Sequence, residues 1–391
     1  MKLAKCMSRL GTETAFEVLA RARALEAKGQ EIIHLEIGEP DFSTPENIVE
    51  AGVRALRAGQ THYTPSPGIG ELRSTIAKHI SKTRAIPVSP EQVVVTPGAK
   101  PIMFFTIMAL CEPGDEVIYP NPGFPIYESM INFVGARPVA APLRESRQFR
   151  LDIDEVAGLF SEKTRLVIIN SPHNPTGGVL EASDLAALAE LAVRYDSVVL
   201  SDEIYSRMIY EGEHHSISSL PGLAERTIVL DGFSKTYAMT GWRLGYAIVP
   251  DWLSFAFGRL IINSVSNVCS FAQHGAVEAL RGPQDEVDKM VAEFHARRDL
   301  VVDGLNAIPG ISCLRPSGAF YVLPQVSGTG LTGAELSTRL LYEAGVSTLA
   351  GTAFGGVATD HIRLSYATSQ ANIRTALDRI GKFVGTLAVS A

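Results

Sequence analysis

Between about residues 90 and 280, short apolar runs alternate with stretches of helical periodicity, and this alternation constrains the fold most. Continuously apolar runs of this length indicate strands that are buried on both faces of a mainly parallel sheet. One intervening stretch, 182–195, reads as an amphipathic helix. The pattern predicts an α/β domain with seven strands. They are expected at 92–96, 115–119, 137–143, 164–170, 197–203, 226–232 and 243–249.

A chain of 391 residues is longer than one hydrophobic core usually serves, so we expect two domains. The last hundred or so residues differ from the alternating region. A long charged helix, roughly 284–307, leads into "AFYVLPQV" and later "HIRLSYA", a smaller α+β pattern. We therefore predict a large domain over 46–283 and a small domain formed by 1–45 and 284–391.

The composition excludes several classes of function. A net charge of −7 gives no support to a nucleic-acid partner, which requires a basic face. The longest apolar stretch, 101–111, is about half of a membrane span, and the N-terminus has no apolar signal core. The four cysteines are far apart and form no paired motif. We expect a cytoplasmic enzyme that contacts neither membrane nor nucleic acid.

Ligands of open α/β sheets bind beyond the carboxyl ends of the strands, so the residues that follow each run are the site candidates. In "VVVTPGAKPIMFF" (93–105), a helix starts after a Pro-Gly turn, and the N–H groups of Ala99 and Lys100 can bind an anion. In "INSPHNPTGG" (169–178), Pro175 holds the preceding Asn174 extended on a rigid loop. Each motif alone also fits an ordinary structural turn.

Two further strand ends carry ionisable groups. "LSDEIY" (200–205) places Asp202 and Tyr205 together, a carboxylate for a ligand nitrogen and a phenol donor. "GFSKTYAMTGWR" (232–243) adds Lys235, an amine that can attack a carbonyl, and Arg243, which suits a phosphate. Together the motifs describe a ligand with a phosphate, a ring nitrogen, a phenolic oxygen and an aldehyde. Pyridoxal 5′-phosphate has these four groups.

With these motifs the sequence resembles the class I/II aminotransferases, the fold-type I pyridoxal-phosphate enzymes that are aspartate aminotransferase-like. The likeness runs from "IGEPDF" (37–42) and "HYTPSPGIGELR" (62–73) through the motifs above to "HIRLSYATS" (361–369). It implies a large cofactor-binding domain with a seven-stranded sheet, a homodimer, and ping-pong transfer of an amino group from an L-amino acid to a 2-oxo acid. Acidic substrates of the aspartate and glutamate type are favoured.

The resemblance also implies residue roles. Lys235 would hold the cofactor aldehyde covalently and shuttle the proton, Asp202 would keep the pyridine nitrogen protonated, and Asn174 and Tyr205 would bond the 3′-oxygen. The phosphate would be held by Arg243, Ser234 and the amides of Ala99 and Lys100, with Tyr63 reaching the phosphate of the partner subunit. Phe124 would stack on the ring. The substrate carboxylate would be bound by Arg363, Asn174 and the backbone of Gly38.

The segment departs from the family pattern at one position. Many members have a serine three residues before the lysine, and its hydroxyl contacts the phosphate. Here that position is Gly232, so a neighbouring group or water is expected to compensate.

Three alternatives stay open on the sequence. "GTGLTG" (328–333) matches the glycine pattern of a nicotinamide dehydrogenase, but only about 60 residues follow it, and Thr332 with Glu335 forms a capping box. A pyridoxal-phosphate sensor of a transcription regulator would need a basic module ahead of residue 45. A lyase that uses the same cofactor would share all the cofactor residues.

Two smaller questions concern metals and substrate. His214 and His215 have no third ligand at a suitable spacing, so we expect no metal and interpret them as a solvated loop pair. Lys100 could pair with the distal carboxylate of an acidic substrate or serve only as a helix cap. Aromatic, alanine-type and basic amino acids remain alternatives to the acidic ones.

Overall fold

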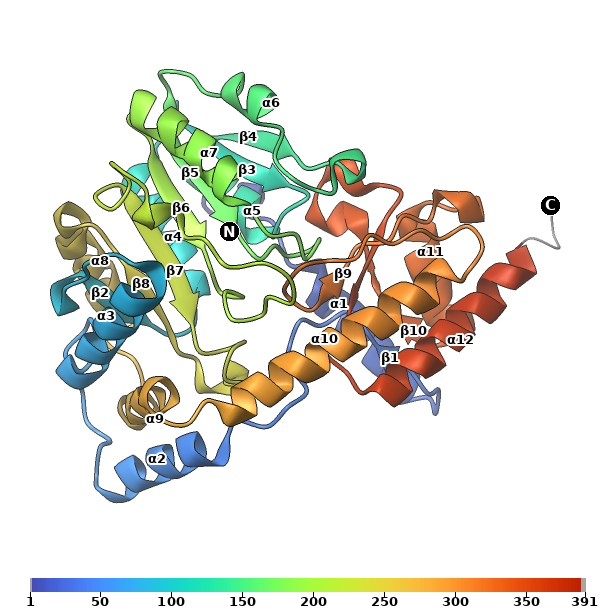
Figure 1. The fold of residues 1–391 in the computed structure, drawn as a ribbon, viewed down its shortest axis with the longest axis horizontal. Helices are drawn as coiled ribbons and strands as arrows, with labels where there is room; N and C mark the ends of the chain where they lie inside the picture. The colour runs from blue at the N-terminus through green and yellow to red at the C-terminus, as the bar shows by residue number, and fades with distance from the viewer. Residues whose placement is uncertain (1, 388–391) are drawn as a thin grey trace.

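The computed structural model describes residues 2–387, and a seven-stranded sheet forms its larger part (Figure 1). The strand order is β2-β8-β7-β6-β5-β3-β4; β8 is antiparallel to β2 and β7, and all other neighbouring pairs are parallel. This confirms the predicted α/β class and all seven predicted strands. The strands are β2 (Val93–Thr96), β3 (Glu116–Asn121), β4 (Arg137–Pro142), β5 (Thr164–Asn170), β6 (Val198–Asp202), β7 (Thr227–Gly232) and β8 (Gly245–Ile248).

Both faces of this sheet are covered by helices, which explains why its strands are continuously apolar. In β5, Leu166 and Ile168 pack on one face, with α4, α5 and α8, while Val167 and Ile169 pack on the other face, with α6 and α7. Helices α3 and α9 cover the β2 end of that second face. These helices are α3 (Gly70–Arg84), α4 (Lys100–Leu110), α5 (Ile126–Val134), α6 (Ile153–Ala157), α7 (Ala182–Arg194), α8 (Asp251–Ser264) and α9 (Ser270–Arg281).

Most of the remaining segments build a smaller unit beside the large sheet, and the long helix α10 runs diagonally into it (Figure 1). Two short sheets form its strands: β1 (Ile33–His34) with β10 (Val346–Ser347), and β9 (Tyr321–Val322) with β12 (Ile362–Ser365) and β11 (Leu349–Ala350). The β1–β10 pair thus joins an N-terminal segment to a C-terminal one. The helices of this unit are α1 (Thr14–Glu26), α10 (Asp285–Asn306), α11 (Gly333–Arg339) and α12 (Gln370–Leu387), whereas α2 (Glu46–Arg57) packs on α9 of the larger part.

The glycine-rich stretch 328–333 leads into a helix start. Thr332 accepts a hydrogen bond from the N–H of Glu335 (3.3 Å), and the Glu335 carboxylate accepts one from the N–H of Thr332 (2.9 Å). This reciprocal pair begins α11, as the capping-box interpretation predicted. No helix within residues 2–387 combines the length and apolar character needed to cross a lipid bilayer.

Candidate active site

A cavity of about 320 Å³ lies at the carboxyl ends of the large sheet, against the smaller unit. It collects all but one of the predicted site residues. Tyr63 is the exception, because its side chain is 91% exposed on the outer surface and does not line the cavity. The predicted residues that line it are Gly38, Ala99, Lys100, Phe124, Asn174, Asp202, Tyr205, Ser234, Lys235, Arg243 and Arg363.

Lys235 stands in the turn that follows β7, and its Nζ donates a 2.6 Å hydrogen bond to the carbonyl of Gly38. Burial lowers the pKa of this amine to about 8, and the charges of Arg243 and Lys100 act in the same direction. Glu39 and Glu13 oppose them. The amine is therefore neutral in a larger fraction of molecules than a surface lysine, which is the state that attacks a carbonyl.

Asp202 ends β6 as a buried carboxylate. Burial raises its pKa to about 7, while two hydrogen bonds, from the Tyr127 hydroxyl (2.6 Å) and the N–H of Ile204 (3.3 Å), act against this rise. A protonated ring nitrogen placed beside Asp202 would supply the missing opposite charge. Tyr127 was not predicted, although its position three residues after Phe124 at the start of α5 was a usable signal.

Tyr205 and Asn174 are held by other residues of the cavity wall. The Tyr205 hydroxyl shares a 2.7 Å hydrogen bond with the hydroxyl of Tyr321, a second residue that was not predicted. The N–H of Asn174 donates to the side-chain oxygen of Asn170 (2.9 Å), and Asn170 in turn donates to the carbonyl of Asp202 (3.0 Å). The ends of β5 and β6 are thereby joined directly beneath the cavity.

The end of the cavity that is formed by the start of α4 and by Arg243 can hold an anion. The first turn of α4 begins at Lys100 and directs its free N–H groups there. Arg243 lies against the same turn and donates to the carbonyls of Thr240 (2.8 Å) and Pro97 (3.4 Å). Gly98 has φ +86°, and a Cβ there would come within 2.3 Å of the guanidinium of Arg243. The positive φ favours glycine at position 98, and a larger residue would also displace the guanidinium of Arg243.

Gly232 packs directly against β8, where it is the register partner of Gly245. A Cβ at 232 would come within 3.0 Å of the Cα of Gly245 and 3.2 Å of the carbonyl of Leu244. The close strand pairing thus leaves little space for a serine at this position. Ser234, two residues further on, lines the cavity and offers a hydroxyl to a bound anion.

Arg363, in β12, brings a buried guanidinium to the other side of the cavity. It donates to the side chain of Asn174 (3.3 Å) and to the carbonyl of Glu36, and the rings of Tyr321 and Phe354 lie 4.6 and 4.9 Å from it. Its Nε has no hydrogen-bond partner, and no carboxylate of residues 2–387 forms an ion pair with it. Burial lowers its pKa. A ligand carboxylate would satisfy both the charge and the free donor.

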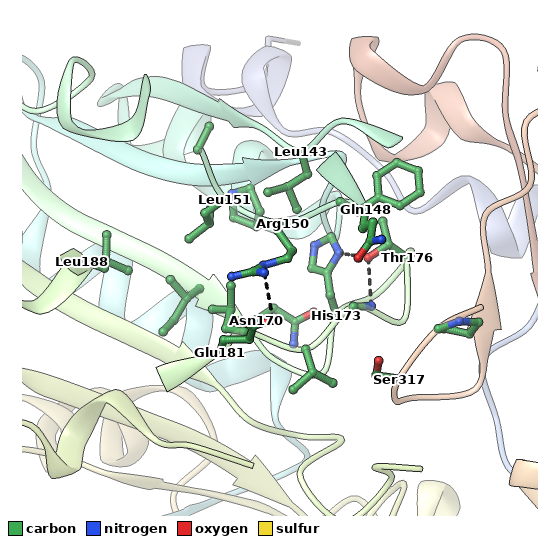
Figure 2. A pocket seen from close by; sticks show the side chains of 18 of the residues that line it. Leu143, Gln148, Arg150, Leu151, Asn170, His173, Thr176, Glu181, Leu188 and Ser317 are labelled. Carbon is green, nitrogen blue, oxygen red and sulfur yellow. Dashed lines mark hydrogen bonds and ion pairs between the residues drawn. The ribbon is translucent and has the colours of Figure 1, made fainter. Parts of the chain in front are cut away.

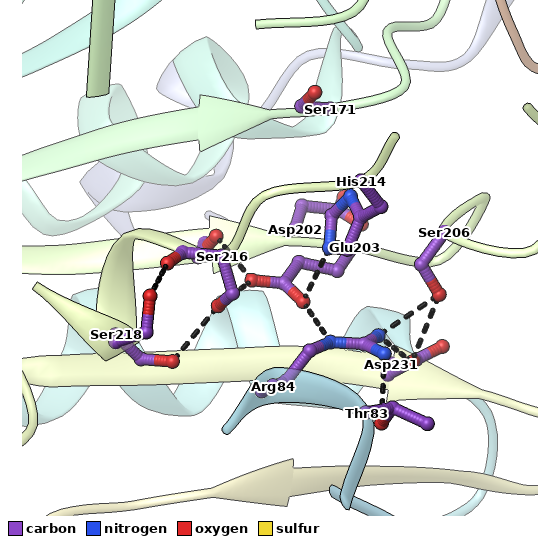
Figure 3. Close-up of polar contacts among 12 residues, drawn as sticks. Thr83, Arg84, Ser171, Asp202, Glu203, Ser206, His214, Ser216, Ser218 and Asp231 are labelled. Atoms are coloured by element: carbon purple, nitrogen blue, oxygen red, sulfur yellow. Dashed lines mark hydrogen bonds and ion pairs between the residues drawn. The ribbon is translucent and has the colours of Figure 1, made fainter. Parts of the chain in front are cut away.

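A buried ionic network supports the strand ends from behind (Figure 3). Arg84, in α3, binds Glu203 (2.6 Å) and Asp231 (2.8 Å), which adjoin the ends of β6 and β7. His214 also joins this network, since its Nε2 lies 2.9 Å from the Glu203 carboxylate. The interpretation of His214 and His215 as a solvated pair was therefore wrong for His214. Within the part of the chain that the structure describes, no His, Cys, Asp and Glu side chains cluster suitably for a metal.

A second cavity, of about 360 Å³, also lies against the segment that carries Asn174 (Figure 2). Its lining is mainly aliphatic, and its Arg150 is already paired with Glu181 (2.8 Å) and Asp184 (2.9 Å). His173 bonds Thr176 (2.8 Å). Neither Lys235 nor Asp202 reaches this cavity, so the smaller, charged cavity is the candidate active site.

Comparison with known proteins agrees with this geometry. The aspartate aminotransferase of Pyrococcus abyssi is 41% identical over 90% of this chain and 92% of its own length. The arginine–pyruvate transaminase of Pseudomonas aeruginosa is 40% identical over 94% and 93%. The solved structure of the Thermus thermophilus aspartate aminotransferase with maleate superposes with a TM-score of 0.94, at 38% identity over 98% and 99% of the two chains.

These similarities span nearly the whole chain rather than single motifs. Residues 30–380 match the family described as aminotransferase class I and II, which uses pyridoxal phosphate. Because the family match, the relatives and the cavity agree, the protein is an aminotransferase that belongs to the class I and II family.

Proposed function

We propose that the charged cavity binds pyridoxal 5′-phosphate and that the enzyme moves the amino group of an L-amino acid to a 2-oxo acid by a ping-pong mechanism. One observation supports this most. The amine of Lys235, whose pKa is lowered, shares its cavity with the buried carboxyl of Asp202 and with the guanidinium of Arg363, which forms no ion pair with the described residues. These three groups suit an aldehyde, a ring nitrogen and a substrate carboxylate, respectively.

The residues fit the cofactor at each of its polar groups. The first turn of α4, Arg243 and Ser234 would hold the phosphate, Asn174 and Tyr205 the 3′-oxygen, and Phe124 one face of the ring. When bound, the cofactor supplies an electron-accepting ring that stabilises negative charge at the substrate α-carbon. Asp202 keeps a proton on the ring nitrogen, because its negative charge favours the protonated form.

Lys235 has two tasks in this proposal. It would hold the cofactor aldehyde until an amino acid replaces it, and its freed, neutral amine would then accept the α-proton and deliver it to the carbon on the far side of the amino nitrogen. Arg363, with Asn174 and the backbone of Gly38, fixes the substrate carboxylate so that the α-hydrogen faces Lys235. The hydrogen bond of Lys235 to the carbonyl of Gly38 supports this proximity.

Two wider features belong to the same proposal. We infer a homodimer in which the exposed Tyr63 reaches the phosphate site of the partner subunit. We also infer that residues 46–283 form the cofactor-binding domain, and that 1–45 and 284–391 form a second domain that supplies Arg363.

Aspartate and glutamate are the substrates we favour. Several similar proteins are aspartate aminotransferases, and the Thermus structure was solved with maleate, a dicarboxylate. Relatives that act on aromatic amino acids and on arginine are about as similar, so basic and aromatic donors are the second candidates.

A panel of amino donors, assayed against 2-oxoglutarate, pyruvate and oxaloacetate, tests this proposal. We expect aspartate and 2-oxoglutarate to give oxaloacetate and glutamate, with parallel lines in double-reciprocal plots. Formation of a 2-oxo acid and ammonia without any acceptor would instead identify a lyase of the same fold.

A further inference from the structure

An ion pair stands at the mouth of the cavity. The Nζ of Lys100 is hydrogen-bonded to the carboxylate of Glu13, and both residues line the cavity. Glu13 occupies the N-cap position of α1, yet its side chain makes no capping hydrogen bond. The carboxylate is turned toward Lys100 instead of serving its own helix.

The surroundings of this pair are apolar. The rings of Phe16 and Phe124 lie 5.7 and 5.6 Å from the Nζ of Lys100, and both also line the cavity. Phe16 is 58% exposed, so its ring is accessible to a bound ligand. A substrate side chain that points out of the cavity would therefore meet two rings and one ion pair.

The charge of Glu13 reaches the centre of the site. It acts to raise the pKa values of Lys235, Tyr321 and Arg363, although burial lowers the pKa values of Lys235 and Arg363 overall. The other carboxylate at the mouth, Glu39, accepts a hydrogen bond from Thr240 rather than from Lys100. Glu13 is thus the acidic group that a dicarboxylic substrate has to approach.

We infer that Glu13 determines substrate specificity by occupying Lys100 in place of a substrate's distal carboxylate. A dicarboxylic amino acid must displace Glu13 to bind Lys100, whereas a neutral amino acid leaves the ion pair intact and packs on Phe16 and Phe124. Glu13 therefore lowers the ratio of kcat/KM for acidic substrates to that for neutral substrates. This inference rests on the proposed function, since it concerns the same site.

The test compares aspartate with 2-aminobutyrate, which has the same carbon skeleton but no distal carboxylate. In Glu13→Gln, the ratio of kcat/KM for aspartate to that for 2-aminobutyrate is expected to rise about tenfold, the scale of one charged hydrogen bond. In Lys100→Met the same ratio is expected to fall by about tenfold or more. Glu17→Gln, an exposed carboxylate one turn along α1, is the matched control and leaves the ratio unchanged.

Inhibition by succinate and by butyrate measures binding apart from turnover. In Glu13→Gln the Ki for succinate is expected to fall relative to the Ki for butyrate. A ratio of kcat/KM that moves less than twofold, with an unchanged ratio of Ki values, would overturn the inference. A wild-type enzyme that transaminates neither donor nor any other amino acid would overturn the proposed function instead.

Discussion

The hydroxyl of Tyr127 donates a 2.6 Å hydrogen bond to Oδ2 of Asp202, and both side chains are buried. This bond stabilises the ionised form of a carboxyl whose pKa burial raises to about 7. Asp202 has to be ionised to hold a proton on a ring nitrogen. Tyr127 thus acts as a positioning residue for Asp202.

Replacing Tyr127 by Phe is expected to move the acid limb of the kcat/KM profile to higher pH. Without the donor the pKa of Asp202 rises further, so the carboxylate forms only at higher pH and activity is lost on the acid side. We expect a shift of about one pH unit, which lowers activity by roughly fivefold near pH 7 and by up to about tenfold further down the acid limb. Tyr195→Phe, remote from the cavity, is the control, and an unmoved acid limb in Tyr127→Phe would refute this role.

Replacing Lys235 by Ala is expected to abolish nearly all turnover and the visible absorbance of covalently held cofactor. Cofactor should still co-purify with this variant, because the first turn of α4 and Arg243 would hold its phosphate. Absorbance spectra and single-turnover assays measure both effects. Lys289→Ala, an exposed lysine paired with Glu286, serves as the control. Turnover that survives in Lys235→Ala would contradict the assignment of this lysine.

The sequence predicted the parts of the site that follow strands. Asp202 ends β6, Lys235 and Asn174 lie three and four residues after β7 and β5, and parallel strands bring their carboxyl ends to one edge. Tyr321 and Glu13 were missed because they reach the cavity from the smaller unit, over sequence separations that no local pattern records. Arg84 was missed for the same reason, since its partners Glu203 and Asp231 lie 119 and 147 residues away.

Replacing Arg84 by Met is expected to destabilise the protein strongly, because Glu203 and Asp231 would remain buried without a counter-charge (Figure 3). Loss of one partner of a buried ion pair costs about 3–5 kcal/mol of unfolding free energy. Arg207→Met, which breaks an exposed pair with Asp288, is the control and should cost at most about 1 kcal/mol. Urea-unfolding midpoints measure both changes.

The loss of unfolding free energy in Arg84→Met is expected to depend on pH. In the wild type the pKa of Glu203 is lowered to about 2, mainly by the charge of Arg84 against the effect of burial, and that of Asp231 is raised to about 6 by burial. Without Arg84 both pKa values rise, so the folded variant binds more protons as the pH falls. The deficit should therefore be larger at pH 8 than at pH 5. A deficit that grows on acidification would contradict this account.

Replacing Arg363 by Leu is expected to weaken substrate binding without the loss of stability that usually follows removal of a buried arginine. Losing one partner of a buried charged contact costs about 2–5 kcal/mol, so KM should rise at least about 30-fold. The free protein, however, holds Arg363 buried with an unsatisfied Nε and without a carboxylate, an arrangement that itself costs stability. The melting temperature of cofactor-free Arg363→Leu should therefore stay close to that of the cofactor-free wild type.

Arg297 provides the matched comparison for this prediction. It is buried to a similar degree, but it binds Asp41 (2.6 Å) and Glu293 (2.9 Å). Arg297→Leu leaves these carboxylates without their counter-charge and should lower the melting temperature of the cofactor-free protein. Arg363→Leu should not. If both variants lose stability equally, or if KM is unchanged in Arg363→Leu, then Arg363 is a structural residue rather than the site of the substrate carboxylate.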